Sequence, residues 1–189
     1  MTAEPLARLT AAEYLALERA TRDKHEFVDG EIVAMAGASE PHTLITLNIG
    51  TEFNLQMRGR SCRAYVADLR VAVSPDGPFY YPDVVALCGQ PELLDAEADT
   101  LLNPAVVVEV LSPSTEAYDR GVKAPAYRAM ATLQEYLLVS QEAVRAEHYR
   151  RQPNGGWVLA DHTGLDDSIE LVSVGCTLSL AVAYDKVEF

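Results

Sequence analysis

The chain has 189 residues, of which 49% are apolar and 23% charged. This length and balance predict one soluble globular domain spanning residues 1–189, and they exclude a chain that is mainly disordered. No apolar run reaches the roughly 18 residues that a membrane span needs, and residues 1–10 lack the apolar core of a signal peptide. The net charge of −13 argues against indiscriminate nucleic-acid binding, although a local basic groove remains compatible with it.

Several enzyme classes are disfavoured by missing motifs. The chain contains no P-loop, dinucleotide fingerprint, His-Glu-x-x-His zinc helix or Gly-x-Ser-x-Gly elbow. Cys62, Cys88 and Cys176 are too widely spaced for a zinc motif, and three cysteines cannot pair completely. We therefore expect a reducing, cytoplasmic location and a protein that is neither a serine hydrolase nor a nucleotide-binding enzyme.

The N-terminal part of the chain predicts two helices and a hairpin between them. A capping box, with Thr at its first position and Glu three residues later, opens a helix over residues 10–22. An Asp-Gly pair in the middle of residues 26–35 predicts a hairpin turn. A second helix begins at Ser39 or Pro41 and carries a broad apolar face. That face consists of Leu44, Ile45, Leu47, Ile49, Phe53 and Met57.

Strands dominate the rest of the chain. We expect them at residues 62–66, 69–73, 80–87, 105–111, 136–139, 144–149, 157–160 and 169–174, the last of which extends the sheet. Residues 90–103 are acidic and typical of a loop, and a helix is expected over residues 119–130. Residues 105–111 are almost continuously apolar, as in a central strand. This order predicts an α/β or α+β domain with a mixed β-sheet flanked by helices.

Glu109 is the most informative residue because it interrupts this apolar strand. A carboxylate there is costly to bury unless a cation or hydrogen bonds compensate it. Strand alternation places its side chain on the same face as Val107 and Leu111. The structural alternative is a charge paired with an arginine at the end of a sheet.

Asp83 is the second candidate, since Pro82-Asp83 precedes an apolar segment. Proline fits the first position of a strand, and a simple turn aspartate is the alternative interpretation. If the strands of Asp83 and Glu109 are neighbours, both carboxylates can face one ion. Hard oxygen ligands of this kind suit Mg²⁺, with Mn²⁺ as the alternative.

Lys123 follows the Glu109 strand on the next helix. Asp119, Lys123 and Tyr127 are spaced four apart and therefore share one helix face. From that face Lys123 can reach back to the carboxylates and hold a phosphate or orient a water. An ordinary Asp–Lys pair on a solvated face is the alternative. Pro125 lies inside this helix, so the helix is expected to kink or to begin late.

Two further residues complete the candidate set. Glu26 precedes the hairpin turn and can point toward the same edge of the sheet, although a surface ion pair is the simpler interpretation. His42 opens the second helix, where it can meet a phosphate or play a structural role. The other three histidines show no pattern typical of a site.

The order of these motifs resembles the PD-(D/E)XK nuclease superfamily. In more detail, the chain is similar to the Uma-two family of restriction-endonuclease-like proteins. The resemblance extends from the hairpin segment Glu-Phe-Val-Asp-Gly-Glu at residues 26–31 to the segment Glu-Tyr-Leu-Leu-Val at residues 135–139. Between them it includes Pro82-Asp83, the segment Glu-Val-Leu-Ser-Pro-Ser-Thr at residues 109–115, Asp119, Lys123 and Tyr127. It covers most of the domain.

The resemblance implies a restriction-endonuclease-like core and a metal-dependent endonuclease that acts on DNA. Asp83, Glu109 and the backbone carbonyl of Val110 would bind Mg²⁺ or Mn²⁺, and Glu26 would add an acidic ligand. The superfamily has a lysine two residues after the glutamate, where this chain has Leu111. The Uma-two pattern instead supplies the lysine from the following helix, and Lys123 fits that position.

Two basic segments are candidates for guiding DNA. Residues 56–70 contain four arginines against one aspartate, a local charge of +3, and Arg120 and Arg128 flank Lys123. Arginines that follow a helix are also favoured by the helix dipole alone. We further expect a homodimer, for which the apolar residues 178–184 offer an exposed edge, with a place in the core as the equal alternative. The main alternative function is a catalytically inactive nuclease-fold protein that acts as a nucleic-acid or protein interaction module, which the acidic net charge favours.

Overall fold

The computed structural model describes residues 8–35 and 37–189, so most of the segment tested for a signal peptide lies outside the described residues. Its centre is a six-stranded mixed sheet with β8 paired parallel to β9 and antiparallel to β6. The strand order is β11 (Trp157–His162), β10 (Ala146–Arg151), β9 (Glu135–Ser140), β8 (Val106–Leu111), β6 (Val84–Cys88) and β3 (Cys62–Val66). This architecture confirms the predicted mixed sheet flanked by helices.

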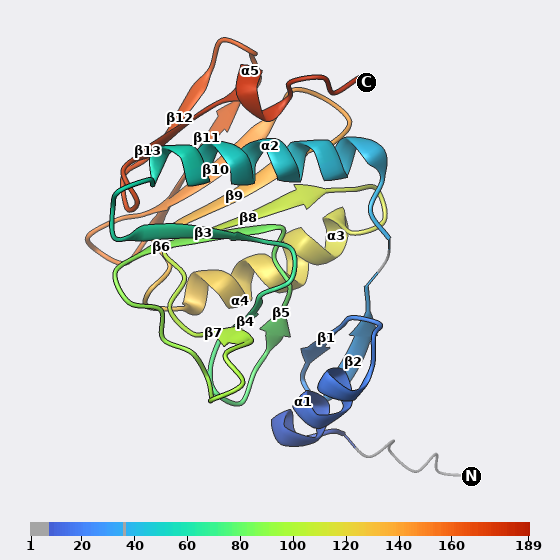
Figure 1. Ribbon diagram of the computed structural model, residues 1–189. Coiled ribbons are helices and arrows are strands. Elements are labelled where there is room, and N and C mark those ends of the chain that lie inside the picture. The colour runs from blue at the N-terminus through green and yellow to red at the C-terminus, as the bar shows by residue number, and fades with distance from the viewer. Residues whose placement is uncertain (1–7, 36) are drawn as a thin grey trace.

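Helices cover both faces of this sheet (Figure 1). One face packs against α2 (Glu40–Gln56), and the other faces α3 (Glu116–Tyr118), a π-helical turn η1 (Asp119–Lys123) and α4 (Ala124–Ala129). Strand β8 separates two apolar cores because its side chains alternate. Val106, Val108 and Val110 join the α2 core, whereas Val107 and Leu111 join the α4 core. The expected face of Glu109 is therefore confirmed.

A second, smaller sheet carries the N-terminal part of the chain. Its order is β2 (Glu31–Ala34), β1 (His25–Val28), β5 (Phe79–Tyr80), β4 (Arg70–Ala72) and β7 (Thr100–Leu101). Helix α1 (Ala11–Ala20) packs on it through Tyr14, whose ring stacks on Phe27 at 4.9 Å between centroids. This aromatic packing holds the β1–β2 hairpin beside the main sheet, at the lower right of Figure 1.

Local signals in the first sixty residues are confirmed. Thr10 caps α1 and forms the capping box with Glu13. Asp29 and Gly30 both have positive φ, 50° and 85°, as a two-residue hairpin turn requires. Ser39 caps α2 through the backbone N–H of His42. The predicted apolar face of α2 is buried at Ile45, Ile49, Phe53 and Met57, whereas Leu44 is half-buried and Leu47 is 56% exposed.

Three expectations about strands are wrong, and the structure decides between two alternatives for residues 178–184. Residues 80–87 do not form one strand: β5 ends at Tyr80, β6 begins at Val84, and the two belong to different sheets. Pro82 lies at the break and has no N–H for a ladder. The acidic segment 90–103 contains β7, which continues the smaller sheet.

Residues 169–174 do not extend the main sheet, because β12 (Ser168–Leu171) pairs with β13 (Cys176–Ser179). Residues 178–184, which include α5 (Leu180–Ala183), are largely core against α2 rather than an exposed dimer edge.

The cysteines show one pair and one free thiol. Cys62 and Cys88 are register partners on β3 and β6 and form a disulfide, while Cys176 is free and buried. The odd cysteine therefore remains unpaired, as its number predicts. Within residues 8–35 and 37–189, no helix is both long and apolar enough to cross a membrane.

Candidate active site

The site begins where β6 and β8 separate. The ladder between them ends at the pair Val84–Val108, and continuing its register by one residue places Asp83 opposite Glu109. At this position the side chain of Asp83 replaces the strand partner: its Oδ2 accepts the N–H of Val110 at 2.7 Å. The predicted neighbouring strands are therefore confirmed, and the two carboxylates come from the two arms of one fork.

Glu109 is 3% exposed and lies against the helical side of the sheet. Its Oε1 accepts a hydrogen bond from Tyr127 at 3.1 Å and contacts Lys123 Nζ at 3.3 Å. Burial raises the pKa of Glu109 well above its usual value, Lys123 opposes that rise, and the neighbouring carboxylates add to it. The compensating cation is thus a lysine from the next helix, and the alternative of an arginine at the sheet end is wrong.

Lys123 lies at the centre of three carboxylates from three different elements. Its Nζ is 2.9 Å from Glu26 Oε1, 3.3 Å from Glu109 Oε1 and 3.2 Å from Asp119 Oδ1. Burial alone would lower the pKa of Lys123, but these carboxylates raise it well above its usual value. The ammonium is therefore charged and buried, and the solvated Asp–Lys pair and the surface position for Glu26 are both wrong.

The helix that supplies Lys123 is irregular in this region. It begins at Glu116 rather than at Asp119, and residues 119–123 form a π-helical turn in which the N–H of Ala124 bonds to the carbonyl of Asp119. This wider turn lies directly before Pro125, which has no N–H to continue an α-helical ladder. The turn brings Asp119 and Lys123 together over the sheet, and Tyr127 on α4 reaches the same oxygen of Glu109.

His42 approaches the fork from the opposite side. It occupies the first turn of α2, and its Nε2 is 3.3 Å from Asp83 Oδ2. Burial alone would lower the pKa of His42, but the contact with Asp83 outweighs it and raises the pKa above the usual value, with a smaller contribution from the Val110 carbonyl. His42 therefore contacts Asp83, one of the predicted metal ligands.

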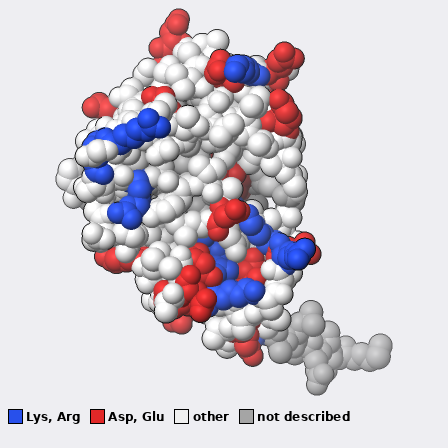
Figure 2. All heavy atoms as spheres, in the orientation of Figure 1, with Lys and Arg blue, Asp and Glu red and all other residues white. Residues whose placement is uncertain are grey.

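A cavity of about 640 Å³ opens onto these residues. Its walls come from β2, the N-terminal end of α2, the loop after β8 and the π-helical turn. Figure 2 shows a hollow on the right of this face, between the end of α2 and the β1–β2 hairpin. Glu26, Asp83, Glu109, Asp119 and Lys123 all line the cavity, so the structure brings together every side chain that the sequence nominates.

The donor atoms of the fork fit a hard divalent cation, although the described residues do not already form a complete set of metal ligands. Among the described residues, no three His, Cys, Asp or Glu side chains already converge as a metal-binding group. Asp83 and Glu109 nevertheless line the cavity, and the second oxygen of each, Oδ1 and Oε2, is engaged in no hydrogen bond or ion pair within the described part of the chain. Two free carboxylate oxygens beside a backbone carbonyl are the ligand types that Mg²⁺ prefers.

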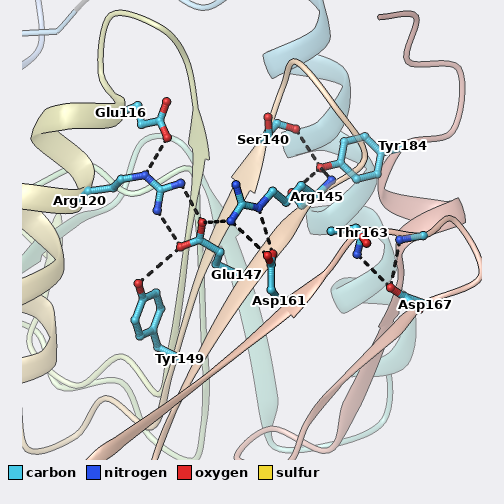
Figure 3. Close-up of polar contacts among 11 residues, drawn as sticks. Glu116, Arg120, Ser140, Arg145, Glu147, Tyr149, Asp161, Thr163, Asp167 and Tyr184 are labelled. Carbon is cyan, nitrogen blue, oxygen red and sulfur yellow. Dashed lines mark hydrogen bonds and ion pairs between the residues drawn. The ribbon is translucent and has the colours of Figure 1, made fainter.

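The basic residues beside the third motif are neutralised. Figure 3 shows Arg120 between two acids: its Nε bonds to Glu116 at 2.7 Å, and its two terminal nitrogens bond to Glu147 at 2.7 and 2.9 Å. Glu147 also contacts Arg145 on the same sheet face. Arg128 lies over the ring of Tyr149. These side chains stabilise the packing of the helix on β10 and do not form a basic groove.

The arginines of residues 56–70 are also dispersed. Arg70 is buried and pairs with Asp99, and Arg60 donates to the carbonyls of Val174 and Gly175. In Figure 2 the basic groups on the left lie away from the hollow. Both lysines that line the cavity are paired, Lys24 with Asp68 and Lys123 with the acids around it. Two of the four arginines that give the local charge of +3 are therefore used inside the protein, whereas Arg58 and Arg63 are exposed.

Sequence reasoning missed two members of the site. Asp119 belongs to the family pattern and to the helix face of Lys123, but the sequence assigns it no role in the site. For His42 the sequence leaves open a phosphate contact and a structural role. For Asp119 a signal existed, because its spacing to Lys123 and Tyr127 places all three on one helix face. For His42 the sequence held no signal beyond its place at a helix start.

Comparisons with known proteins identify the family of this chain and agree with its fold. The family model Uma2, described as "Putative restriction endonuclease", matches residues 11–183. Two uncharacterized proteins of Synechocystis, sll1609 and slr1290, are each 36% identical to this chain. Their matches cover 86% and 98% of this chain and 92% and 96% of the relatives. A crystal structure of a "putative nuclease belonging to DUF820" from Anabaena variabilis has a TM-score of 0.77 at 18% identity, covering 95% of this chain and 99% of that one, and shares the fold.

Proposed function

The chain belongs to the Uma2 family, and we propose that it is a metal-dependent endonuclease that hydrolyses phosphodiester bonds of DNA. One observation carries the proposal: the fork between β6 and β8 presents Asp83 and Glu109 to a cavity that also contains a buried lysine. Two carboxylates, a cation and room for a phosphate are what phosphodiester hydrolysis requires.

Asp83, Glu109 and the carbonyl of Val110 are the proposed ligands of Mg²⁺ or Mn²⁺. Such an ion, when bound, polarises a phosphate and lowers the pKa of a coordinated water. The bond from the N–H of Val110 to Asp83 fixes the carboxylate beside the strand that bears Glu109. Glu26 as a further metal ligand stays a prediction, because its Oε1 is engaged by Lys123 and by the N–H of Tyr81.

Lys123 places a positively charged side chain at this site. Its ammonium contacts Glu109 Oε1 while Glu109 Oε2 remains available at the cavity. From this position it stabilises negative charge on a phosphate under attack or orients the attacking water. Tyr127 holds the same oxygen of Glu109 and keeps the carboxylate oriented.

The experiment compares nicking of supercoiled plasmid by the wild type, Asp83→Asn and Glu109→Gln with Mg²⁺ and with Mn²⁺. Asp166→Asn is the matched control, because it makes the same chemical change at an exposed residue outside the site. We expect nicking by the wild type and the control and a loss of at least about 100-fold in the two site variants. Equal nicking by wild type and Asp83→Asn would refute the metal-site mechanism.

A second candidate function is an interaction module with the nuclease fold but without cleavage. The neutralised arginines and the net charge of −13 favour it, because duplex DNA binding depends on free basic groups. This alternative predicts no nicking with either metal under any condition.

The homodimer and the cytoplasmic location belong to the proposal as well. Cutting both strands of a duplex is readily achieved by a pair of subunits, and a sedimentation mass of one subunit at micromolar concentration would refute the dimer. The cytoplasmic location requires that Cys62 and Cys88, which form a disulfide in the structure, be thiols in the cell. The two residues are register partners in the five-residue ladder between β3 and β6.

A further inference from the structure

Lys123 is bound as a metal ion would be, by oxygen atoms that converge from separate elements. Glu26 belongs to β1, Glu109 to β8 and Asp119 to the π-helical turn, and each contributes one oxygen within 3.3 Å of the ammonium. The lysine is 6% exposed and Asp119 2% exposed. Burying three carboxylates around one point is costly unless a cation occupies it.

Asp119 gives a second, independent indication of a cation position. Its Oδ1 is fully buried and accepts no hydrogen bond within the described residues, although it lies 3.2 Å from Lys123 Nζ. The rings of Tyr80 and Tyr118 lie 5.9 and 5.7 Å from the same ammonium. Negative charge and ring faces surround this point, as is favourable for a positive group.

Other oxygen atoms of the fork are not used by the ammonium. Asp83 Oδ1, Glu109 Oε2 and the carbonyl of Val110 are not among the contacts of Lys123. The carboxylates are thus divided into a set that holds the ammonium and a set that is open to one ion. In two-metal nucleases two ions lie roughly 3.5–4 Å apart and share carboxylate ligands.

We propose that Lys123 is a built-in second cation, whose ammonium holds the place of the second ion of a two-metal site, so that this site binds one divalent ion. The inference rests on the proposed function, because it assigns the roles of cations at the same fork. A second divalent ion would need the oxygens that face the ammonium and would be repelled by it. Glu26 and Asp119 are then positioning residues that hold the lysine.

The test counts Mn²⁺ ions on the folded full-length chain by titration and electron paramagnetic resonance. We expect one uncoupled ion on the wild type and on Asp119→Asn, and markedly weaker binding to Asp83→Asn. Lys123→Ala, which empties the acidic position, is expected to bind two ions with exchange coupling between them. Lys24→Ala, the same change at a lysine outside the acidic cage, is expected to keep one ion.

Each other outcome overturns a defined part of the reasoning. Two coupled ions on the wild type refute the inference and leave the proposed metal-dependent nuclease intact. A single ion on folded Lys123→Ala also refutes it, because the vacated carboxylates would then not form a cation site. No ion on the wild type removes the metal site and the inference together. The wild-type and Asp119→Asn counts decide the matter if Lys123→Ala does not fold.

Discussion

Replacing Lys123 by methionine tests whether the acidic cluster depends on one cation for its stability. Methionine fills a similar volume but leaves Glu26, Glu109 and Asp119 without their shared ammonium. Removing one partner of a buried ion pair costs about 3–5 kcal/mol, because the remaining charge is buried and uncompensated. We expect the free energy of unfolding at pH 7 to fall by about that amount.

Lys24→Met is the matched control, because it removes the same group from a pair with Asp68 that is much more exposed. A pair of that kind contributes about 0–1 kcal/mol, so the two lysine variants should differ severalfold. Urea unfolding followed by circular dichroism measures both. The assay needs only the folded chain and is independent of nuclease activity.

The stability that Lys123→Met loses relative to the wild type, called the deficit below, should depend on pH in a defined direction. Burial already raises the pKa of Glu109 above its usual 4.5, and loss of the lysine raises it further. A carboxyl whose pKa is higher in the folded state loses stability as pH rises from its unfolded pKa toward the folded one. The deficit should therefore be small near pH 4.5 and largest at neutral pH. A double variant with Glu109→Gln should recover about 1–3 kcal/mol of it. A loss no larger than that of Lys24→Met, with no coupling to Glu109, would refute the reasoning.

Two further outcomes concern ion pairs away from the site. Burial alone would raise the pKa of Glu135, but the contact with His148 and the hydrogen bonds from Ser173 lower it below 4.5. Its contribution to stability is therefore present above that pH and lost as the pH falls below it. Glu135→Gln should lower the free energy of unfolding by about 1–3 kcal/mol at pH 7, and urea titrations should show no difference from the wild type below about pH 4. A constant difference at every pH would contradict this. Arg120→Ala should lower the free energy of unfolding, measured with urea, by a similar amount and leave the affinity for plasmid unchanged. Weaker DNA binding would show instead that Arg120 contacts the DNA.

The parts of the fold that sequence predicted well are those with local causes. The capping box at Thr10, the Asp-Gly turn at residues 29–30 and the Ser39 cap each depend on a few adjacent residues. The site was predictable for a related reason. A glutamate inside an apolar strand has few structural explanations, so Glu109 indicated a buried partner. Lys123 was a candidate for that partner because it shares a helix face with Asp119 and Tyr127, four residues to either side.

The errors came from tertiary contacts that leave no local pattern. Residues 80–87 contain enough apolar side chains for one strand, but Glu26 accepts the N–H of Tyr81 and the chain changes sheets at Pro82. The arginines counted as a basic segment lie close in sequence, yet Arg70 faces Asp99 and Arg60 faces carbonyls near Val174. Charge along a chain does not reveal which charges meet partners after folding.

The change of sheets at Pro82 also explains why the site lies at the fork. Had residues 80–87 continued as one strand, Asp83 would pair in the ladder and the N–H of Val110 would bond to a backbone carbonyl. Because the strand breaks, the Asp83 side chain takes that N–H, and the edge of β8 beyond Val108 faces the cavity. The Pro-Asp dipeptide thus acts first on the backbone, by ending one ladder, and then through its carboxylate. The same break that made the strand prediction fail exposes the atoms on which the proposed metal chemistry depends.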